Sequence, residues 1–324
     1  MDAKRPSGRQ QRMVGVRFDE LAALLCLDQV RGFGPGAFRA MHEASIEPEA
    51  LLEDISLLPI EGKRGEKLRR QIAALGPGER SLAESRAMRQ LHRAEELGVQ
   101  ILTYRHADYP PNLLFSNNAV PILYARGDVR VLKQTKVVAC VGSRKIRLRY
   151  IKQLQAFSKL AAQGGWLVAS GFANGADTAA HEAAIAANGT TVLVMPSGLD
   201  IPFPPENRKL WKEWHDQPGV AMISEFPLGT KASALTLRKR NKTIVGISNA
   251  VLIAQTSVKG GTMNAYRFAL EQRKQVLTFP PDGNPDTDGN RLITDEVNRQ
   301  ENLLGEDTPS LPELERWLAL SSST

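Results

Sequence analysis

Apolar residues recur every three or four positions in the first part of the chain, as on one face of an amphipathic helix. The pattern predicts three short helices, at Phe18–Val30, Ala37–Ala44 and Lys67–Leu75, and a longer one at Leu82–Leu97. Gly98 follows the last of these and is a typical helix terminator. We therefore expect the N-terminal region to be helical.

Beyond this region the pattern changes to short apolar runs separated by turns and amphipathic segments. The apolar runs predict strands at Val99–Thr103, Val137–Val141, Trp166–Ser170, Thr191–Met195, Val220–Glu225, Val251–Gln255 and Val276–Phe279. The amphipathic segments predict helices at Arg149–Ala162, Asp177–Ala187, Glu206–Trp214 and Thr262–Gln272. Apolar strands that alternate with helices indicate parallel βαβ units, so the predicted fold class is α/β with a doubly wound, mostly parallel sheet.

The predicted elements and the composition divide the chain into four segments. Residues 1–13 are polar and basic with no apolar stretch behind them, which predicts a disordered basic tail and no secretory signal. We expect residues 14–78 to form a small all-helical domain and residues 79–305 to form the α/β domain with its lead-in segment. Residues 306–324 are expected to be a short C-terminal segment.

Whole-chain composition narrows the class of protein. The chain has 324 residues, of which 42% are hydrophobic, and no apolar run approaches the roughly 18 residues that a membrane-spanning helix needs. Cys26 and Cys140 lie far apart with no metal-ligand spacing around them, so they suit buried thiols in a reducing compartment. We expect a cytoplasmic protein with no membrane partner and no metal.

The net charge of +7 is distributed unevenly. Residues 129–176 contain nine Lys and Arg and no acid, and residues 226–270 contain seven and none. These two windows carry sixteen positive charges against a total of +7, so the rest of the chain is net −9. If the two windows meet in space they suggest a polyanionic partner, although chance together with buried strands explains part of the pattern.

Glycine-containing turns separate the predicted N-terminal helices. Val30–Gly36 lies between the first two helices, and Leu58–Gly65 is a weaker copy. Glycine permits positive φ and close approach, so such a hairpin can present free backbone N–H groups to a nucleic-acid phosphate. A plain helical turn that uses glycine as a C-cap explains the same residues equally well.

In a doubly wound sheet, ligands bind beyond the carboxyl ends of the strands. The first such turn, Gly142–Lys145, combines a glycine, the hydroxyl of Ser143 and the guanidinium of Arg144 ahead of a helix, which is phosphate-binding chemistry. It matches neither the dinucleotide fingerprint nor the Walker motif, so ATP hydrolysis is not supported.

The next turn, Ser170–Asp177, has two interpretations. Asp177 at a helix start and His181 one turn later could shape a ligand site, or they could be a helix cap with a structural His–Asp contact. Glu225 ends a later strand and is the best-placed general acid or base, although strand-end carboxylates more often cap or pair.

Two further segments carry cations. The run Arg238–Lys242 lies between two strands in an acid-free window, which favours phosphate or nucleic-acid binding over a solvated face. Lys259–Thr262 follows the strand Val251–Gln255 and opens a helix, so it predicts a second backbone cradle for an anion.

Taken together, these turns resemble the DNA-processing protein A family (DprA, also called Smf), and their order and spacing span about residues 105 to 295. The segments that carry the resemblance are Tyr109–Pro111, Pro121–Tyr124, Val141–Arg144, Ser170–His181, Ser197–Asp200, Pro205–Arg208, Ile223–Pro227, Arg240–Lys242 and Gly289–Ile293. The N-terminal helices resemble that family's sterile-alpha-motif-like domain.

The resemblance implies an extended Rossmann-like domain that dimerises, binds single-stranded DNA and loads a RecA-type recombinase in natural transformation and recombination. It implies no catalysis and no cofactor. The expected DNA- and phosphate-binding residues are Gly142, Ser143, Arg144, Lys145, Gly171, Asn174, Gly175, Arg238, Arg240, Asn241, Lys242, Lys259, Gly260, Gly261 and Thr262, with Asp177, His181 and Glu225 shaping the pocket.

The chain departs from the family pattern in three places. Asn174 stands where the family usually has arginine, and Lys259–Thr262 replaces a Ser-Gly-Ser-Leu-type turn and can supply a replacement cation. The chain ends soon after Leu311–Leu320, so we expect no winged-helix domain. These differences affect the expected partner and pathway more than DNA binding.

Other functions remain open at this stage. The same type of sheet resembles cytokinin-activating phosphoribohydrolases and related ligand sensors, whose Gly-Gly-x-Gly-Thr turn is followed by a glutamate. Here Gly260-Gly261-Thr262 lacks the second half and no acid precedes Glu271, which disfavours a hydrolase but not a sensor of a nucleotide-derived ligand. A scaffold in a phage- or plasmid-defence system is a further alternative.

Overall fold

The computed structural model describes residues 14–297 and residue 316. The predicted basic tail and most of the predicted C-terminal segment lie outside these residues. The N-terminal region consists of helices, as the periodicity predicts, and its elements are α2 (Phe18–Leu27), α3 (Pro35–Glu43), α4 (Pro48–Glu53), the 3₁₀ turn η1 (Ile55–Leu57), α5 (Gly62–Ala73) and α6 (Pro77–Leu97). The prediction missed α4 and the first turns of α5 and α6.

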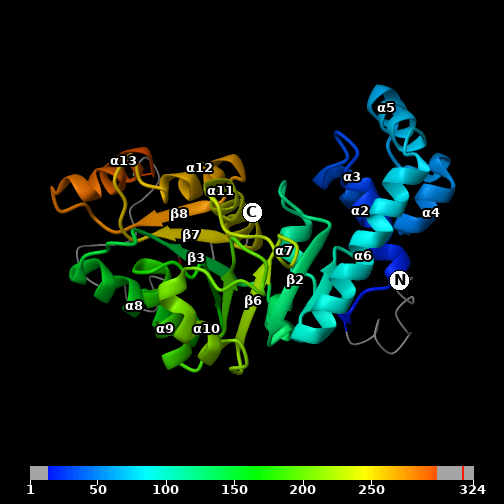
Figure 1. The fold of residues 1–324 in the computed structure, drawn as a ribbon. Helices are drawn as coiled ribbons and strands as arrows, with labels where there is room; N and C mark the ends of the chain where they lie inside the picture. Colours follow the sequence, from blue (N-terminus) through cyan, green and yellow to red (C-terminus); the bar gives the residue numbers. More distant parts are fainter. Residues whose placement is uncertain (1–13, 298–315, 317–324) are drawn as a thin grey trace.

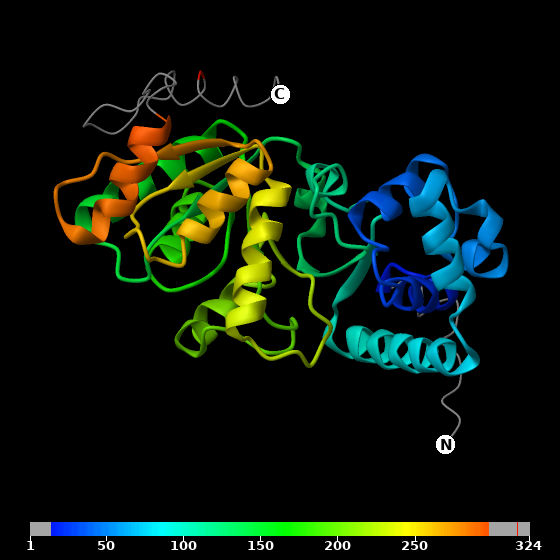
Figure 2. The same ribbon diagram turned by 90° about the horizontal axis from the view of Figure 1, so that it is seen from above.

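An eight-stranded mixed sheet forms the rest of the described molecule, in the order β1-β2-β6-β5-β4-β3-β7-β8 (Figures 1 and 2). The strands are β1 (Gln100–Thr103), β2 (Ile122–Gly127), β3 (Val137–Val141), β4 (Leu167–Ser170), β5 (Thr191–Val194), β6 (Val220–Ser224), β7 (Ala250–Ile253) and β8 (Gln275–Thr278). Strands β3 to β8 are parallel, whereas β1–β2 and β2–β6 are antiparallel pairs. The α/β fold class is confirmed, and β2 is the strand that the sequence pattern did not predict.

Helices cover both faces of the sheet (Figure 1). They are α7 (Pro111–Leu114), α8 (Leu148–Gln163), α9 (Ala176–Ala186), α10 (Arg208–Trp214), α11 (Ala234–Ile247), α12 (Met263–Glu271) and α13 (Asp288–Val297), with the 3₁₀ turns η2 (Val129–Lys133), η3 (Pro205–Asn207) and η4 (Pro285–Thr287). Successive side chains of a strand point to opposite faces of the sheet, so neighbouring residues of β3 pack against the helices on opposite sides. Val138 packs in the cluster beneath α8 and α9, and Ala139 packs in the cluster that includes α11 and α12.

Helix α11 is the main difference from the predicted pattern. Its cationic run was expected in a segment between two strands, but the run lies within a helix of 14 residues. The helix begins with a capping box, in which Ser233 accepts from the Thr236 N–H and the Thr236 side chain accepts from the Ser233 N–H. A helical run spreads its charges around the axis, so the cations of α11 point in different directions.

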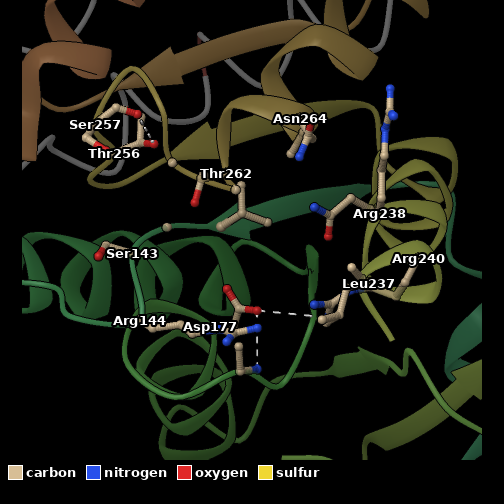
Figure 3. Close-up of a pocket in the computed structure, with 18 residues that line it drawn as sticks. Ser143, Arg144, Asp177, Leu237, Arg238, Arg240, Thr256, Ser257, Thr262 and Asn264 are labelled. Carbon is tan, nitrogen blue, oxygen red and sulfur yellow. Dashed lines mark hydrogen bonds and ion pairs between the residues drawn. The ribbon is translucent and has the colours of Figure 1, made fainter. Parts of the chain in front are cut away.

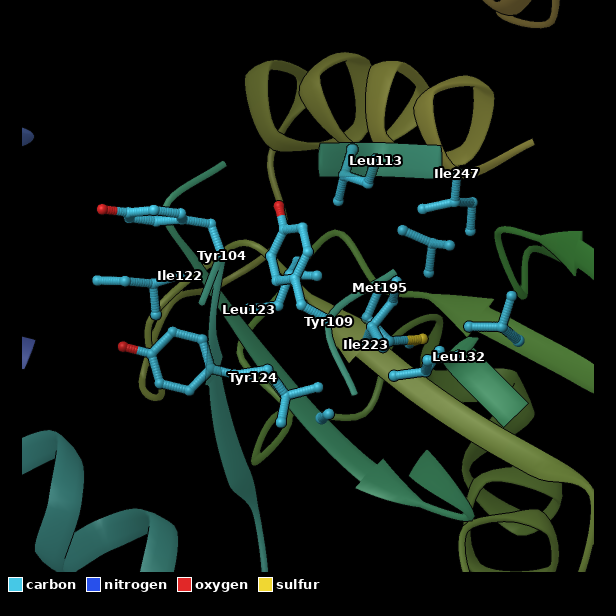
Figure 4. Packing of buried hydrophobic residues seen from close by; sticks show 14 of the residues in the cluster. Tyr104, Tyr109, Leu113, Ile122, Leu123, Tyr124, Leu132, Met195, Ile223 and Ile247 are labelled. Atoms are coloured by element: carbon cyan, nitrogen blue, oxygen red, sulfur yellow. The ribbon is translucent and has the colours of Figure 1, made fainter. Parts of the chain in front are cut away.

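The strands β1 and β2 join the sheet to the helical region. Tyr104 and Tyr124 pack in one apolar cluster with Leu123 and Ile223, and Tyr109 also donates a hydrogen bond to the Val120 carbonyl at 2.7 Å (Figure 4). This cluster continues without a break into the residues of α2 and α3. The helical region and the sheet therefore share one apolar core. Residues 78 and 79 lie within α6, so no separate linker divides the two regions there.

Helix α6 spans the junction between the two regions. The Gln90 side chain bonds both the N–H and the C=O of Leu228, and Arg93 forms an ion pair with Asp200. Within residues 14–297 no helix is long and apolar enough to cross a membrane.

Candidate nucleic-acid interface

A cavity of about 510 Å³ opens at the carboxyl ends of β3, β4 and β7 (Figure 3). This is the edge at which the sheet type predicts a ligand. The cavity is lined by Val141, Gly142, Ser143, Arg144, Ala173, Asp177, Ala234, Leu237, Arg238, Arg240, Asn241, Thr256, Ser257, Gly260, Gly261, Thr262, Asn264 and Ala265. Residues from both acid-free windows thus meet in one place.

The loop after β3 forms one wall of the cavity. Gly142 is required there, because an added Cβ would lie 2.7 Å from the Ala176 side chain. The loop is held by backbone bonds, since the Ser143 N–H donates to the Gln255 carbonyl and the Lys145 N–H donates to the Ser143 hydroxyl. Arg144 is exposed and forms no ion pair within the described residues, so its charge is free to meet an anion.

Helix α11 supplies the opposite wall. Arg238 is exposed, and Asn241, one turn further along, presents an amide to the cavity. Lys242 points elsewhere, because its ammonium group lies 5.0 Å from the centre of the Phe268 ring in a cation–π contact. Of the four cations in the run, Arg238 and Arg240 line the cavity, and of these only Arg238 is exposed.

Arg240 is part of the buried floor. Its side chain is 5% exposed, its Nη1 donates to the Val194 carbonyl at 3.0 Å, and the same atom lies 4.0 Å from the Asp177 carboxylate. Burial lowers the pKa of Arg240 and raises the pKa of Asp177, while the attraction between the two charges opposes both shifts. Arg240 lines the cavity, but its guanidinium already contacts the Val194 carbonyl and Asp177, so direct contact of Arg240 with a phosphate stays a prediction.

Two predicted glycines serve this internal packing. An added Cβ at Gly171 would lie 1.4 Å from Arg240 Nη1, so the guanidinium fills the space that we expected a DNA strand to approach. Gly175 has a φ of +83° and packs against the carbonyls of Ser143 and Arg144. Gly260 and Gly261, by contrast, line the cavity as expected.

Several other expected residues lie outside the cavity lining. They are Lys145, Asn174, Lys242, Lys259, His181 and Glu225. His181 is fully buried and bonds Thr191 at 2.7 Å, beside the rings of Phe172 and Trp214. Asp177 instead lies near Arg240, so the structural His–Asp contact, one of the two interpretations, is not found among the described residues. Glu225 accepts a hydrogen bond from the Thr243 hydroxyl at 2.8 Å, which makes it a partner within the fold.

Sequence reasoning missed three polar residues of the cavity, Thr256, Ser257 and Asn264. The signal was present for the first two, because they lie in the loop just after β7 and such positions lie at the ligand edge. Asn264 occupies the first turn of α12, and only the packing of α12 beside α11 brings its amide to the cavity.

The lining chemistry suits an anionic, polar ligand. Arg144 and Arg238 supply free charge, Ser143 and Thr262 supply hydroxyls, and the Asp177 carboxylate is nearly buried. None of the lining residues is aromatic. The described residues hold no cluster of His, Cys, Asp or Glu that could bind a metal ion.

The chain is similar to known proteins over most of its length. Residues 100–302 match the family model for DNA recombination-mediator protein A. Protein Smf of Escherichia coli is 34% identical over 182 residues, which is 56% of this chain and 48% of that protein. Protein Smf of Synechocystis is 30% identical over 269 residues, which is 81% of this chain and 65% of that protein.

Solved structures with the same fold include DNA processing protein A from Streptococcus pneumoniae. That chain aligns with a TM-score of 0.64 and 22% identity, over 89% of this chain and 99% of its own. The Helicobacter pylori protein aligns with a TM-score of 0.58 and 21% identity, over 69% and 96%. The chain spans about half to two thirds of the length of its curated relatives in Escherichia coli and Synechocystis. Its sequence match and its sheet place it in the DNA recombination-mediator protein A family.

Proposed function

We propose that this protein binds single-stranded DNA in the cavity between the loop after β3 and helix α11. The observation that carries the proposal is the placement of two exposed, unpaired arginines, Arg144 and Arg238, on facing walls of one cavity. The Helicobacter pylori structure concerns a single-stranded DNA binding mode of DNA processing protein A, which supports the same ligand class. Two arginines can hold consecutive phosphates of a strand.

The cavity favours contacts to the backbone of the strand over stacking on its bases. The lining has hydroxyls, amides and glycine backbone but no aromatic ring, and aromatic rings are the usual stacking platforms for bases. Binding through phosphates weakens steeply with salt, because each contact releases counterions. We therefore expect little base preference.

The family supports a mediator role beyond binding. We propose that the protein is not an enzyme, that it acts in the cytoplasm as a homodimer, and that it protects incoming DNA and loads a RecA-type recombinase on it. Asp177, the carboxylate of the described cavity lining, lies 4.0 Å from the Arg240 guanidinium, which supports a structural role for it.

Charge reversal tests the site. Arg144→Glu with Arg238→Glu should weaken binding of a single-stranded oligonucleotide roughly 10- to 100-fold and reduce the slope of log affinity against log salt by about 1 to 2. Fluorescence anisotropy at two salt concentrations measures both. The matched control is Arg86→Glu with Lys159→Glu, which reverses two exposed cations of α6 and α8 outside the cavity. Equal binding by both double variants contradicts the assignment.

A sensor of a nucleotide-derived ligand is the second candidate. It is favoured by the facing glycine loops Gly142–Arg144 and Gly260–Thr262, which enclose a cavity of about 510 Å³. The two functions separate in one measurement. A nucleoside phosphate that co-purifies with the protein, together with no affinity for single-stranded DNA, replaces the first proposal with the second.

A further inference from the structure

A strongly basic surface lies on the helical region, away from the cavity. Helix α5 carries five cations and one acid, while residues 14–61 carry nine acids and three cations. Lys63, Arg64, Lys67 and Arg70 are all exposed. The positive charge of the helical region is therefore concentrated on α5. This helix lies at the end of the molecule remote from α8 and α13 (Figure 1).

The hairpin between α2 and α3 adjoins this helix. The Arg64 guanidinium lies 3.5 Å from the point where a Cβ on Gly36 would be, so residues from the two glycine turns are neighbours. Arg31, in the α2–α3 hairpin, is also exposed. We call Arg31, Lys63, Arg64, Lys67 and Arg70 the α5 surface.

The cations of the α5 surface are not used inside the fold. Among the described residues, Arg31, Lys63, Arg64 and Lys67 form no ion pair, and Arg70 bonds only the Glu66 carbonyl. The nearby acid Glu61 faces Arg69 at 3.9 Å, which lies outside the surface. Unpaired like charges on neighbouring turns repel one another, so their concentration here costs stability that a polyanion would recover.

The backbone beneath the surface is tightly built. An added Cβ at Gly65 would lie 1.8 Å from the Ile60 carbonyl, and Gly62 has a φ of +69°. Neither α3 nor α5 has an acid in its first turn, and the exposed carboxylates next to the surface, Glu61 and Glu66, are outnumbered by its five cations. The first turn of α5, which carries Lys63 and Arg64, is thus closely packed on the residues before it.

The surface distinguishes between forms of nucleic acid. It presents no aromatic ring, because Phe33 of the hairpin is buried against Phe38. The cavity also lacks an aromatic ring, so shape is what separates the two sites: the cations of the α5 surface are exposed on the outside of the helical region and do not line the cavity. A duplex can meet such an open surface with the phosphates of its backbone, without entering a recess. We propose that the α5 surface binds the sugar–phosphate backbone of duplex DNA, as a second nucleic-acid site that is independent of the cavity.

Neutralising the surface in the full chain tests this inference. The variant Lys63→Gln, Arg64→Gln and Lys67→Gln keeps good helix formers at exposed positions, so it should fold with an unchanged circular dichroism spectrum. We expect its affinity for a blunt duplex to fall roughly tenfold or more and its salt slope to fall by about 2 to 3. Its affinity for a short single strand should stay the same.

The control removes the same charge elsewhere. Arg86→Gln, Arg89→Gln and Lys159→Gln should change duplex binding by less than about twofold, because a general loss of net charge acts only weakly at a distance. Unchanged duplex binding in the α5 variant overturns the proposal and leaves the surface to an acidic protein partner. Equal losses for duplex and single strand, or equal losses in the control, also overturn it.

The outcome does not depend on the cavity. The Arg144→Glu and Arg238→Glu variant should lose single-strand binding and keep duplex binding, which is the reverse of the α5 variant. If the cavity variant keeps single-strand binding, the function proposed for the cavity fails while the duplex result stands.

Discussion

At the scale of single residues, burial decides which charged or polar groups can reach a ligand. His181 follows Asp177 by one turn of α9, yet the two side chains bond different partners, Thr191 and Arg240. Thr191 donates its hydroxyl hydrogen to the Val168 carbonyl and therefore accepts from His181 Nδ1. The imidazole is neutral, and burial lowers its pKa from 6.5 to about 3.

This neutral imidazole should make stability depend on pH. The unfolded chain binds a proton at His181 below about pH 6.5 and the folded chain does not until about pH 3, so stability is lost as the pH falls through this window. The limiting slope is about 1.4 kcal/mol per pH unit. Urea unfolding of His181→Asn between these limits should give a shallower loss than the unchanged chain. Equal slopes contradict the neutral, buried imidazole.

At the scale of elements, α11 turns a cationic run into a wall of the site. The capping box fixes where the helix begins, and that start determines which of its cations face the cavity. Arg238 faces the cavity, Arg240 turns beneath it, and Lys242 contacts Phe268. Three of the four cations in this five-residue run thus have three different environments.

Removing the cap should loosen this wall. Ser233→Ala leaves the Thr236 N–H without its side-chain acceptor and should lower the free energy of unfolding by about 1 kcal/mol. Because Arg238 lies in the next turn of the helix, affinity for single-stranded DNA should fall as well. Ser233→Thr keeps a hydroxyl acceptor and is the control, measured by urea unfolding and anisotropy. If the alanine and threonine variants behave alike, the cap does not organise the wall.

At the scale of the whole molecule, α6 fixes the helical region to the sheet. Its Arg93 reaches Asp200 in the loop after β5, and the Asp200 side chain is 4% exposed. The Gly229 N–H also donates to this carboxylate at 2.9 Å. The helical region is thereby held beside the loops of the α/β region, with a shared apolar core beneath it.

This junction can be tested by a double-mutant cycle. Arg93→Ala leaves the nearly buried Asp200 without its cation and should cost about 1 to 2 kcal/mol in the free energy of unfolding. Arg93→Ala with Asp200→Asn should recover part of that loss, because the amide needs no counter-charge. Additive losses in urea unfolding show that the two side chains are not coupled.

Local patterns were enough to predict much of the architecture. Six strands of the parallel sheet and the helices α2, α8, α9 and α12 follow from the spacing of apolar residues, because that spacing reflects which face of an element is buried. β2 escaped prediction because it pairs antiparallel with β1 and β6 and so lies outside the alternation of strand and helix on which the prediction rested. α11 escaped because its charges masked the helical period.

The sequence by itself determined the fold class, the edge of the sheet that carries the site and the family, because these depend on short-range periodicity and on the order of motifs. Only the tertiary structure decided which cations are free. Arg144 and Arg238 remain exposed, whereas Arg240 is buried over Gly171 beside Asp177. The three arginines look alike in a sequence, and the difference comes from the packing of α11 on the sheet, which no local pattern records.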